Sequence, residues 1–437
     1  MKTVILLAHG ITNPLKAHRR MEFSNRILFL SKYYERIILV SKDDNLKNKV
    51  TRLEIEKITG FYIYRIPLKE IIATLQFTRL VRMYKPDLVI CDSTSDAPTV
   101  ILPKILFNFP IAVFARAFDT DLFIYSSRVR VFRKSKLRRL IKGFLFIKDT
   151  FIFNLSEKII SVSPALIKYI NYFILRAHNN KTKFIPNSYF HTKNIPQVSI
   201  TEAKQKLDAI LKQFNENPFI ITYAGNLSPN KRPDIAISAL KILLKKHLNV
   251  ILLIIGTGIL SQDLHNYCSK LEISHRVFFL GKLPQYETIA LISKSHLLIH
   301  PSISEGFSNS ISESMAMGTP VLSYAHKTIK DFCRKKGAIL VNNENPKDYA
   351  SEIYRILTDS SLRETSTKNS LALIKPLVEY SNEKRYTDIY QEIKAAEEHP
   401  LQKQSIRQVI RLFLRWLKLF FQYLRWEEHF ENLEKLN

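Results

Sequence analysis

The sequence predicts an α/β protein made of two doubly wound, Rossmann-like domains followed by an amphipathic helical tail. Strand-like apolar runs alternate with helix-like segments along most of the chain, a pattern typical of parallel sheets covered by helices on both faces. With 437 residues the chain is too long for one hydrophobic core and fits two domains with an extension. Only ten glycines occur, and seven of them lie from Gly225 onward. Because glycine is needed where φ is positive or a ligand comes close, the second half is expected to hold a ligand.

The first domain is expected over residues 1–190. Its expected strands are 3–8, 37–41, 62–66, 87–91, 111–116 and 158–163, and its expected helices run from residue 10 to near 34 and over 70–84, 97–107 and 164–173. Ligands of such folds bind at the carboxyl ends of the strands. The residues at those positions are His9, Gly10, Arg116 and Asp119.

The second domain is expected over residues 200–378, after a linker at 197–200. Its expected strands are 219–225, 250–256, 277–281, 297–299, 321–323 and 338–341, and a helix is expected over 346–357. The strand 250–256 ends in Gly256-Thr-Gly258, which we interpret as shaping a turn rather than touching a ligand.

Two carboxylates stand out in the second domain, Glu305 and Glu313, with seven residues between them. Glu305 is expected on a loop after a buried strand, and Glu313 inside the helix that follows. Amide groups near Phe307 to Ile311 would point out of the helix N-terminus, where the dipole favours an anion such as phosphate. Because a carboxylate repels phosphate, Glu305 is expected to face hydroxyl groups. The alternatives are a solvated Glu305 and a capping box in which Ser310 and Glu313 only satisfy backbone amides.

The stretch from Glu305 to Val321 resembles the Glu-x7-Glu signature of the retaining, GT-B-fold glycosyltransferases of family 4, or glycosyl transferases group 1. The shared segments are Glu-Gly-Phe, Glu-Ser-Met-Ala-Met-Gly and Thr-Pro-Val. The resemblance covers residues 1–395 and is strongest over 219–325. It implies two domains facing across a cleft, a nucleotide diphosphate sugar bound by the second, an acceptor bound by the first, and a helix at 379–398 that crosses back to the first domain.

The resemblance also implies residue roles. Glu305 and Lys231 are the expected catalytic residues, with Glu305 on donor-sugar hydroxyls and Lys231 on the diphosphate. Glu313 is expected on the ribose, Leu283 on the base, and Asn226 stands where the family has an arginine. The donor-binding set is Glu313, Arg232, Asn226, Gly225, Gly306, Phe307, Ser308, Asn309, Ser310 and Leu283, and the acceptor-side set is His9, Gly10, Arg116 and Asp119. No metal or other cofactor is expected, since members resembling this chain need none and no Asp-x-Asp motif is evident.

The formal net charge of +27 favours an anionic partner or surface. Arg128–Lys148 contains many basic and aromatic residues and no acidic one. In the tail, over 401–437, the polar positions from Gln404 to Arg425 fall in one arc of a helix, and apolar and aromatic residues fill the rest. Such a helix fits an interfacial position on an anionic membrane. Spanning is disfavoured, because each central cation costs about 2.5–3.5 kcal/mol to insert.

We therefore expect a glycosyltransferase that acts on a lipid-linked or glycan acceptor in polysaccharide or glycoconjugate biosynthesis. It would lie in the cytoplasm, peripheral on the inner face of the plasma membrane, with Arg128–Lys148 and Arg407–Arg425 on anionic lipid. The alternatives are a sugar-nucleotide 2-epimerase of the same architecture and a basic nucleic-acid-binding protein, although no nucleic-acid motif accompanies the charge. The tail has its own alternative, packing on the protein or on a second subunit.

Overall fold

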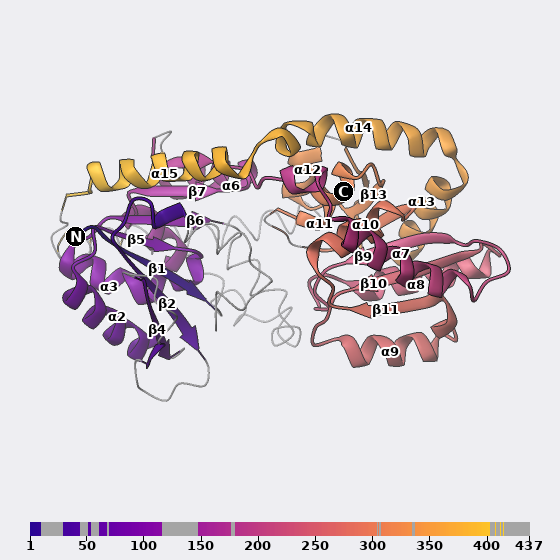
Figure 1. Ribbon diagram of the computed structural model, residues 1–437, viewed down its shortest axis with the longest axis horizontal. Helices are drawn as coiled ribbons and strands as arrows, with labels where there is room; N and C mark the ends of the chain where they lie inside the picture. The colour runs from indigo at the N-terminus through magenta and orange to yellow at the C-terminus, as the bar shows by residue number, and fades with distance from the viewer. Residues whose placement is uncertain are drawn as a thin grey trace. The chain divides into compact units, whose positions relative to one another are not determined.

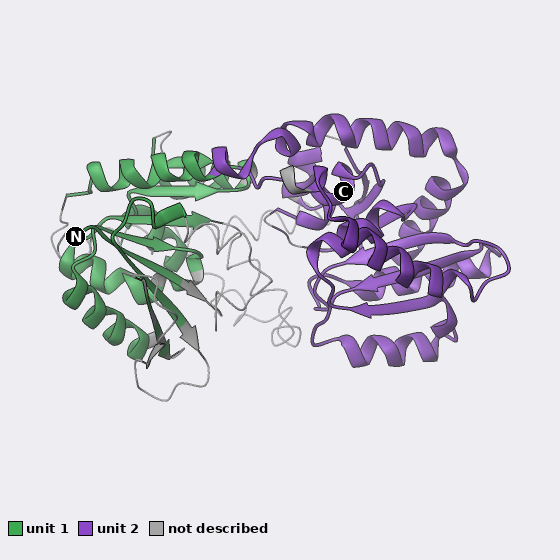
Figure 2. Cartoon of the chain, in the orientation of Figure 1, with its two compact units in different colours: residues 1–124, 129–185, 386–437 green, residues 125–128, 186–385 purple. Residues whose placement is uncertain are grey.

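The computed structural model divides the chain into two compact units (Figure 2). Unit 1 comprises residues 1–124, 129–185 and 386–437, and unit 2 comprises residues 125–128 and 186–385. The residues that the structure describes are 1–9, 29–43, 51–53, 61–67, 70–115, 147–175, 180–303, 305, 307–333, 337–402, 407, 411 and 414.

Unit 1 is built on an eight-stranded sheet in the order β3-β4-β2-β1-β5-β6-β7-β8 (Figure 1). The strands are β1 (Thr3–His9), β2 (Arg36–Asp43), β3 (Thr51–Leu53), β4 (Phe61–Pro67), β5 (Leu88–Cys91), β6 (Ile111–Ala115), β7 (Lys158–Ser161) and β8 (Thr182–Phe184). All neighbours are parallel except β3, which pairs antiparallel with β4. The central strands are continuous apolar runs because helices cover both faces of a parallel sheet.

The helices of unit 1 include α2 (Glu70–Tyr84), α3 (Ala97–Phe107) and α6 (Pro164–Tyr169), which continues into a π-helical segment, Ile170–Leu175. The long helix α15 (Asn382–Glu398) enters this unit late in the sequence. Its Tyr390 ring stacks on Tyr33 with centroids 3.6 Å apart, and its Glu392 accepts from Lys158 at 3.0 Å. Lys2 bonds Glu397 at 2.5 Å across 395 positions of the chain. These contacts attach α15 to the first residues of unit 1.

Unit 2 holds a six-stranded, fully parallel sheet in the order β11-β10-β9-β12-β13-β14. The strands are β9 (Phe219–Ala224), β10 (Val250–Ile255), β11 (Val277–Gly281), β12 (Leu297–His300), β13 (Val321–Tyr324) and β14 (Ile339–Val341). The helices are α7 (Gln197–Leu211), α8 (Pro233–Lys245), α9 (Ser261–Lys270), α10 (Gln285–Ser293), α11 (Asn309–Ala316), α12 (Lys327–Cys333), α13 (Pro346–Thr358) and α14 (Ser360–Glu379). Separate apolar clusters cover the two faces of the sheet, one under α8, α9 and α13 and one under α7, α10, α11 and α14.

The predicted fold class of two parallel-sheet α/β domains is confirmed. The predicted linker at 197–200 is wrong, because Gln197 begins α7. Ala203, Leu207 and Ile210 lie on one face of α7 and are buried, and Lys206 bonds Glu287 of α10 at 2.6 Å. The helical spacing of these apolar residues therefore explains why this segment forms a helix that packs within unit 2.

The surfaces predicted to meet a membrane lie almost entirely outside the described residues. Of Arg128–Lys148 only the last two residues are described, and the prediction is wrong for Lys148, which is buried and pairs with Asp149 at 3.4 Å. Of the tail beyond 402 only Arg407, Arg411 and Leu414 are described, all helical and exposed. Within the described part of the chain, no helix combines the length and the apolarity needed to cross a bilayer.

Candidate functional site

The site is built where β9 and β12 end side by side at the carboxyl edge of the unit 2 sheet. Two hydrogen bonds join the loops that follow these strands: Ile303 N donates to the Asn230 carbonyl at 3.0 Å, and Ser302 Oγ donates to the same oxygen at 3.3 Å. As a result, Lys231 of the first loop forms an ion pair with Glu305 of the second. The two residues predicted to be catalytic thus lie in direct contact.

A third residue, His300, completes this cluster and was missed by the sequence analysis. It ends β12, is 4% exposed, and places Nε2 3.0 Å from Glu305 Oε1. Its Nδ1 lies 3.4 Å from Ser310 Oγ of α11. The signal that could have found it is its position at a strand's carboxyl end, five residues before Glu305.

The electrostatics of the cluster keep Glu305 ionised. Burial by itself raises the pKa of Glu305, but the hydrogen bond with His300 and the charge of Lys231 outweigh it and hold the pKa well below its usual range. Burial acts on His326, just after β13, in the opposite direction, because it disfavours the charged form of a base. Burial lowers the pKa of His326 to about 4, although Glu305 acts to raise it. His326 is therefore neutral at pH 7, and its buried Nε2 has no hydrogen-bond partner among the described residues.

Helix α11 begins immediately after this cluster. Its N-cap is Ser308, no side chain caps it, and Ser310 lies inside the first turn. The alternative capping box of Ser310 and Glu313 is therefore not formed. Glu313 is 6% exposed and instead accepts a hydrogen bond from Gln285 Nε2 at 2.7 Å. With no side-chain cap, the amides of the first turn keep the partial positive charge that favours an anion.

The start of α11 is positioned by a polar network within unit 2. Asn309 Oδ1 accepts from Tyr189 OH at 2.9 Å and from Asn187 Nδ2 at 3.1 Å. Asn187 Oδ1 in turn accepts from Arg385 at 3.1 Å. The ring of Phe307 packs edge-on against Phe332, with centroids 4.8 Å apart, so this predicted donor-binding residue also anchors the loop before α11.

The loop that carries Lys231 is fixed by close backbone approach to the loop after β10. A Cβ on Gly256, whose φ is +141°, would lie 1.9 Å from the Gly225 carbonyl oxygen. A Cβ on Gly258 would lie 2.2 Å from the Leu227 carbonyl oxygen. Both positions therefore need glycine for packing, which agrees with the interpretation of Gly256-Thr-Gly258 as a structural turn.

The remaining predicted donor-binding and acceptor-side residues are exposed or partly buried, paired with other residues, or outside the described part of the chain. Asn226 is exposed, and its carbonyl accepts from Tyr223 OH at 2.9 Å. Arg232 has φ of +50° and pairs with both Asp234 and Glu344, so carboxylates already occupy its guanidinium. Leu283 lies partly buried before α10. Gly306, Gly10, Arg116 and Asp119 are outside the described residues, and His9 is described only as the last backbone position of β1.

The arrangement suits a ligand that carries both hydroxyl groups and negative charge. A buried carboxylate offers acceptors for hydroxyls, while a lysine and an uncapped helix N-terminus beside it offer positive charge and N–H donors. Within the described residues, no group of three or more His, Cys, Asp and Glu side chains is placed to hold a metal ion.

Comparison with known proteins shows what the segment that carries this site is similar to. Residues 205–372 match the model of the glycosyl transferases group 1 family. An uncharacterized glycosyltransferase of Methanocaldococcus jannaschii is 26% identical over 272 residues, which cover 60% of this chain and 61% of the relative. The Escherichia coli UDP-Gal:alpha-D-GlcNAc-diphosphoundecaprenol alpha-1,3-galactosyltransferase is 28% identical over 145 residues, 32% of this chain and 36% of that enzyme. The chain thus spans about three fifths or less of the length of these two relatives.

A solved structure shows that the likeness extends through both units. Anabaena HepE in complex with UDP and glucose superposes with a TM-score of 0.63 at 16% identity, over 90% of this chain and 100% of HepE. The matched family segment lies wholly inside unit 2, which carries the Lys231–Glu305–His300 cluster. The chain therefore has the GT-B fold, and residues 205–372 of its second unit are similar to the glycosyl transferases group 1 family.

Proposed function

We propose that the protein is a glycosyltransferase that moves a sugar from a nucleotide diphosphate sugar to an acceptor with retention of anomeric configuration. The observation that carries the proposal is the Lys231–Glu305–His300 cluster at the uncapped N-terminus of α11. Glu313, the second carboxylate of the signature, lies on that same helix. The names of two similar proteins support a nucleotide sugar as donor, since HepE was solved with UDP and glucose and the Escherichia coli relative is named for UDP-Gal.

The proposed chemistry follows the charge that develops during transfer. As the bond between sugar and diphosphate breaks, negative charge gathers on the leaving group and positive charge on the sugar ring. Lys231 and the first-turn amides of α11 stabilise the leaving diphosphate. Glu305, held ionised by its two neighbours, accepts hydrogen bonds from donor-sugar hydroxyls, and Glu313 accepts from the ribose. No residue is assigned as a nucleophile, and no metal is assigned to the reaction.

The proposed acceptor is a lipid-linked glycan or glycolipid. We propose that unit 1 binds it with the acceptor-side residues His9, Gly10, Arg116 and Asp119. The Escherichia coli relative is named for a diphosphoundecaprenol acceptor, which supports this class. We place the enzyme on the cytoplasmic face of the plasma membrane, with Arg128–Lys148 and the tail on anionic lipid. Arg407 and Arg411 are exposed on helical backbone, as such a tail requires.

A thermal-shift screen of nucleotides and nucleotide sugars tests the donor. A ligand at one hundred times its Kd stabilises the folded protein by about 2.7 kcal/mol. For a unit of this size that free energy corresponds to a shift in Tm of roughly 5–10 °C. The true donor is expected to give this shift, and the mismatched nucleotides are not. A flat response across uridine, guanosine, adenosine and thymidine diphosphate sugars would rule out the proposed function.

A further inference from the structure

Unit 1 exposes an apolar face on two neighbouring helices. On α2, Ile71 is 79% exposed, Leu75 is 62% exposed and Met83 is 60% exposed. On α3, Leu102, Leu106 and Phe107 are each between 44% and 50% exposed. These six residues form what we call the α2–α3 face. They account for six of the fifteen large hydrophobic side chains exposed in the described residues, so the face is a concentration of apolar surface.

The α2–α3 face is continuous because the two helices lie side by side over the same side of the sheet (Figure 1). Thr74 Oγ1 of α2 donates to the Pro98 carbonyl of α3 at 3.4 Å. On α2, Ala73, Phe77 and Leu80 are buried toward the sheet core. Helical periodicity then turns Ile71 and Leu75 to the opposite side, where an ordinary surface helix carries polar residues, and Met83 to the flank of the helix.

Basic residues accompany this apolar surface. Arg79, Arg82 and Lys85 are exposed at the carboxyl-terminal half of α2. Apolar side chains bordered by cations on a helix surface are typical of contact with an anionic bilayer, which accepts both. The net charge of +27 acts in the same direction, since it attracts the whole molecule to an anionic surface.

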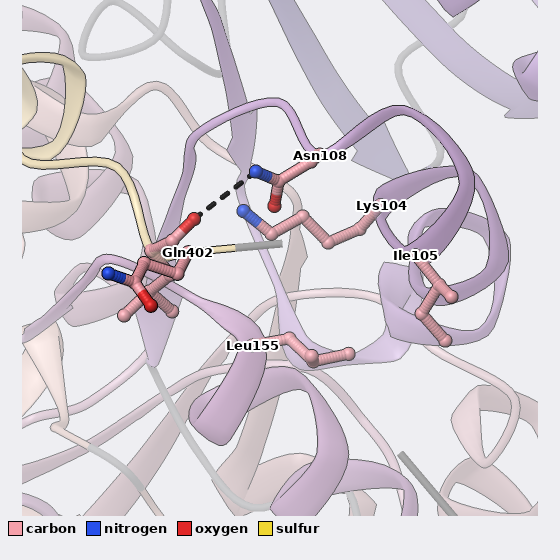
Figure 3. A pocket seen from close by; sticks show the side chains of 6 residues that line it. Lys104, Ile105, Asn108, Leu155 and Gln402 are labelled. Atoms are coloured by element: carbon pink, nitrogen blue, oxygen red, sulfur yellow. Dashed lines mark hydrogen bonds between the residues drawn. The ribbon is translucent and has the colours of Figure 1, made fainter. Parts of the chain in front are cut away.

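The tail leaves unit 1 at the edge of this face. Asn108, directly after α3, donates from Nδ2 to the Leu401 carbonyl at 3.2 Å (Figure 3). Leu401 N donates to Glu157 Oε1 at 3.1 Å. Glu157 is itself fixed by a 2.5 Å ion pair with Lys104 of α3, and both of these side chains are almost fully buried. Leu401, at the start of the tail, is therefore bonded to Asn108, the residue that follows Phe107 at the end of the α2–α3 face.

We propose that the α2–α3 face is a docking surface for an anionic lipid bilayer and meets the same membrane as the tail that starts beside it. This inference rests on the membrane association in the proposed function and adds a second, folded contact to it. Two contacts joined in one chain bind one membrane more tightly than either alone, because the second contact forms at a high effective concentration.

Site-specific fluorescence tests the face in the full-length protein. Cys91, Cys268 and Cys333 are buried, and burial raises the pKa of the Cys268 thiol to about 11, so an introduced surface cysteine is labelled selectively. The probe is an environment-sensitive dye on Leu75→Cys. The matched control is the same dye on Ile259→Cys in unit 2, where the native side chain is 67% exposed. Vesicles of phosphatidylcholine with phosphatidylglycerol are compared with pure phosphatidylcholine.

The tail has its own reporter in the unlabelled protein, because the only two tryptophans are Trp416 and Trp426. We expect anionic vesicles to shift the emission of the dye at position 75 to the blue and to leave the dye at 259 unchanged. The triple variant Ile71→Ser, Leu75→Ser, Leu102→Ser is expected to lower the vesicle partition coefficient by more than about tenfold, as the loss of three large apolar contacts requires. Its nucleotide-sugar binding should stay unchanged.

Three outcomes would overturn the inference. A blue shift of tryptophan with no change at position 75 means that the tail binds alone, and the proposed membrane association then survives. A shift at position 75 that grows with protein concentration without vesicles means that a second copy of the chain covers the face. If anionic vesicles change neither the dye emission at position 75 nor the tryptophan emission, both the docking face and the membrane association are wrong. The proposed transfer reaction is then still tested separately by the thermal-shift screen.

Discussion

Alanine substitutions at three glycines of unit 2 test the close approach between the loop that carries Lys231 and the loop after β10. Gly281 has φ of +64° and open space around its Cβ position, so Gly281→Ala introduces backbone strain alone. That strain is about 1–2 kcal/mol. Gly258→Ala introduces no positive-φ strain, but its Cβ would lie 2.2 Å from the Leu227 carbonyl oxygen. Gly256→Ala combines a φ of +141° with a Cβ 1.9 Å from the Gly225 carbonyl oxygen.

Destabilisation is therefore expected to increase from Gly281→Ala to Gly258→Ala and to be largest for Gly256→Ala. Overpacking costs about 1–3 kcal/mol, and more where the atom that must move is backbone. Adding strain and overpacking gives roughly 2–5 kcal/mol for Gly256→Ala, toward the upper end because the atom that must move is backbone. A unit of this size loses about 2–4 °C in Tm per kcal/mol, so the three variants should separate by several degrees.

Far-UV circular dichroism is the appropriate probe of unfolding, because both tryptophans belong to the tail and none occurs in residues 186–385. Nucleotide-sugar affinity should fall with Gly256→Ala and Gly258→Ala, since both displace the loop that carries Lys231, and should hold with Gly281→Ala. If Gly256→Ala melts within a degree of Gly281→Ala and binds donor normally, the close approach of the two loops is not a property of the folded protein.

Three further predictions concern ionisable groups. Glu305→Gln should lower turnover by about 10²–10³-fold with less effect on nucleotide affinity, measured as kcat against Kd, and near-normal turnover would contradict its assignment. Burial lowers the pKa of His326 to about 4 from its ordinary value of 6.5. The unfolded chain therefore binds more protons, and stability should fall by roughly 2–3 kcal/mol as pH drops from 6.5 to 4. His326→Gln should flatten that part of the pH–stability curve, and an unchanged slope would refute the cause. Glu157→Gln leaves the buried ammonium of Lys104 without its charged partner, although the Phe109 carbonyl still accepts from it. The loss should destabilise unit 1 by about 3–5 kcal/mol, seen as an earlier unfolding transition, whereas Glu392→Gln at the more exposed Lys158 pair should cost about 1 kcal/mol or less.

The sequence predicted most of the secondary structure because apolar periodicity governs it. The expected helix at 70–84 has the bounds of α2, and the expected strands of unit 2 match those of the structure to within two residues. The start of α7 was predicted as a linker because Pro196 precedes it and only Ala203, Leu207 and Ile210 of its 15 residues are buried. Its few apolar positions reveal a helix only once a partner surface is known.

The contacts of the site were less predictable than its members. Lys231 and Glu305 were expected near the same ligand, but their ion pair depends on β9 lying beside β12, an order that local sequence does not encode. His300 was overlooked because a single histidine at a strand end carries no pattern of its own. Gln285 was overlooked for the same reason, since its bond to Glu313 joins two helices 28 positions apart.

The late entry of α15 into unit 1 sets an order for folding during synthesis. Unit 2 is encoded between the two parts of unit 1, so the ribosome completes residues 186–385 before it makes α15. Until then the ring of Tyr33, the side chain of Lys2 and the apolar surface that receives Ile393 have no helix to pack against. The earlier part of unit 1 therefore lacks α15 while the second unit is synthesised and folds. A nascent chain of this kind exposes apolar surface for the time needed to make about 200 residues, which is on the order of ten to forty seconds at about 5–20 residues per second.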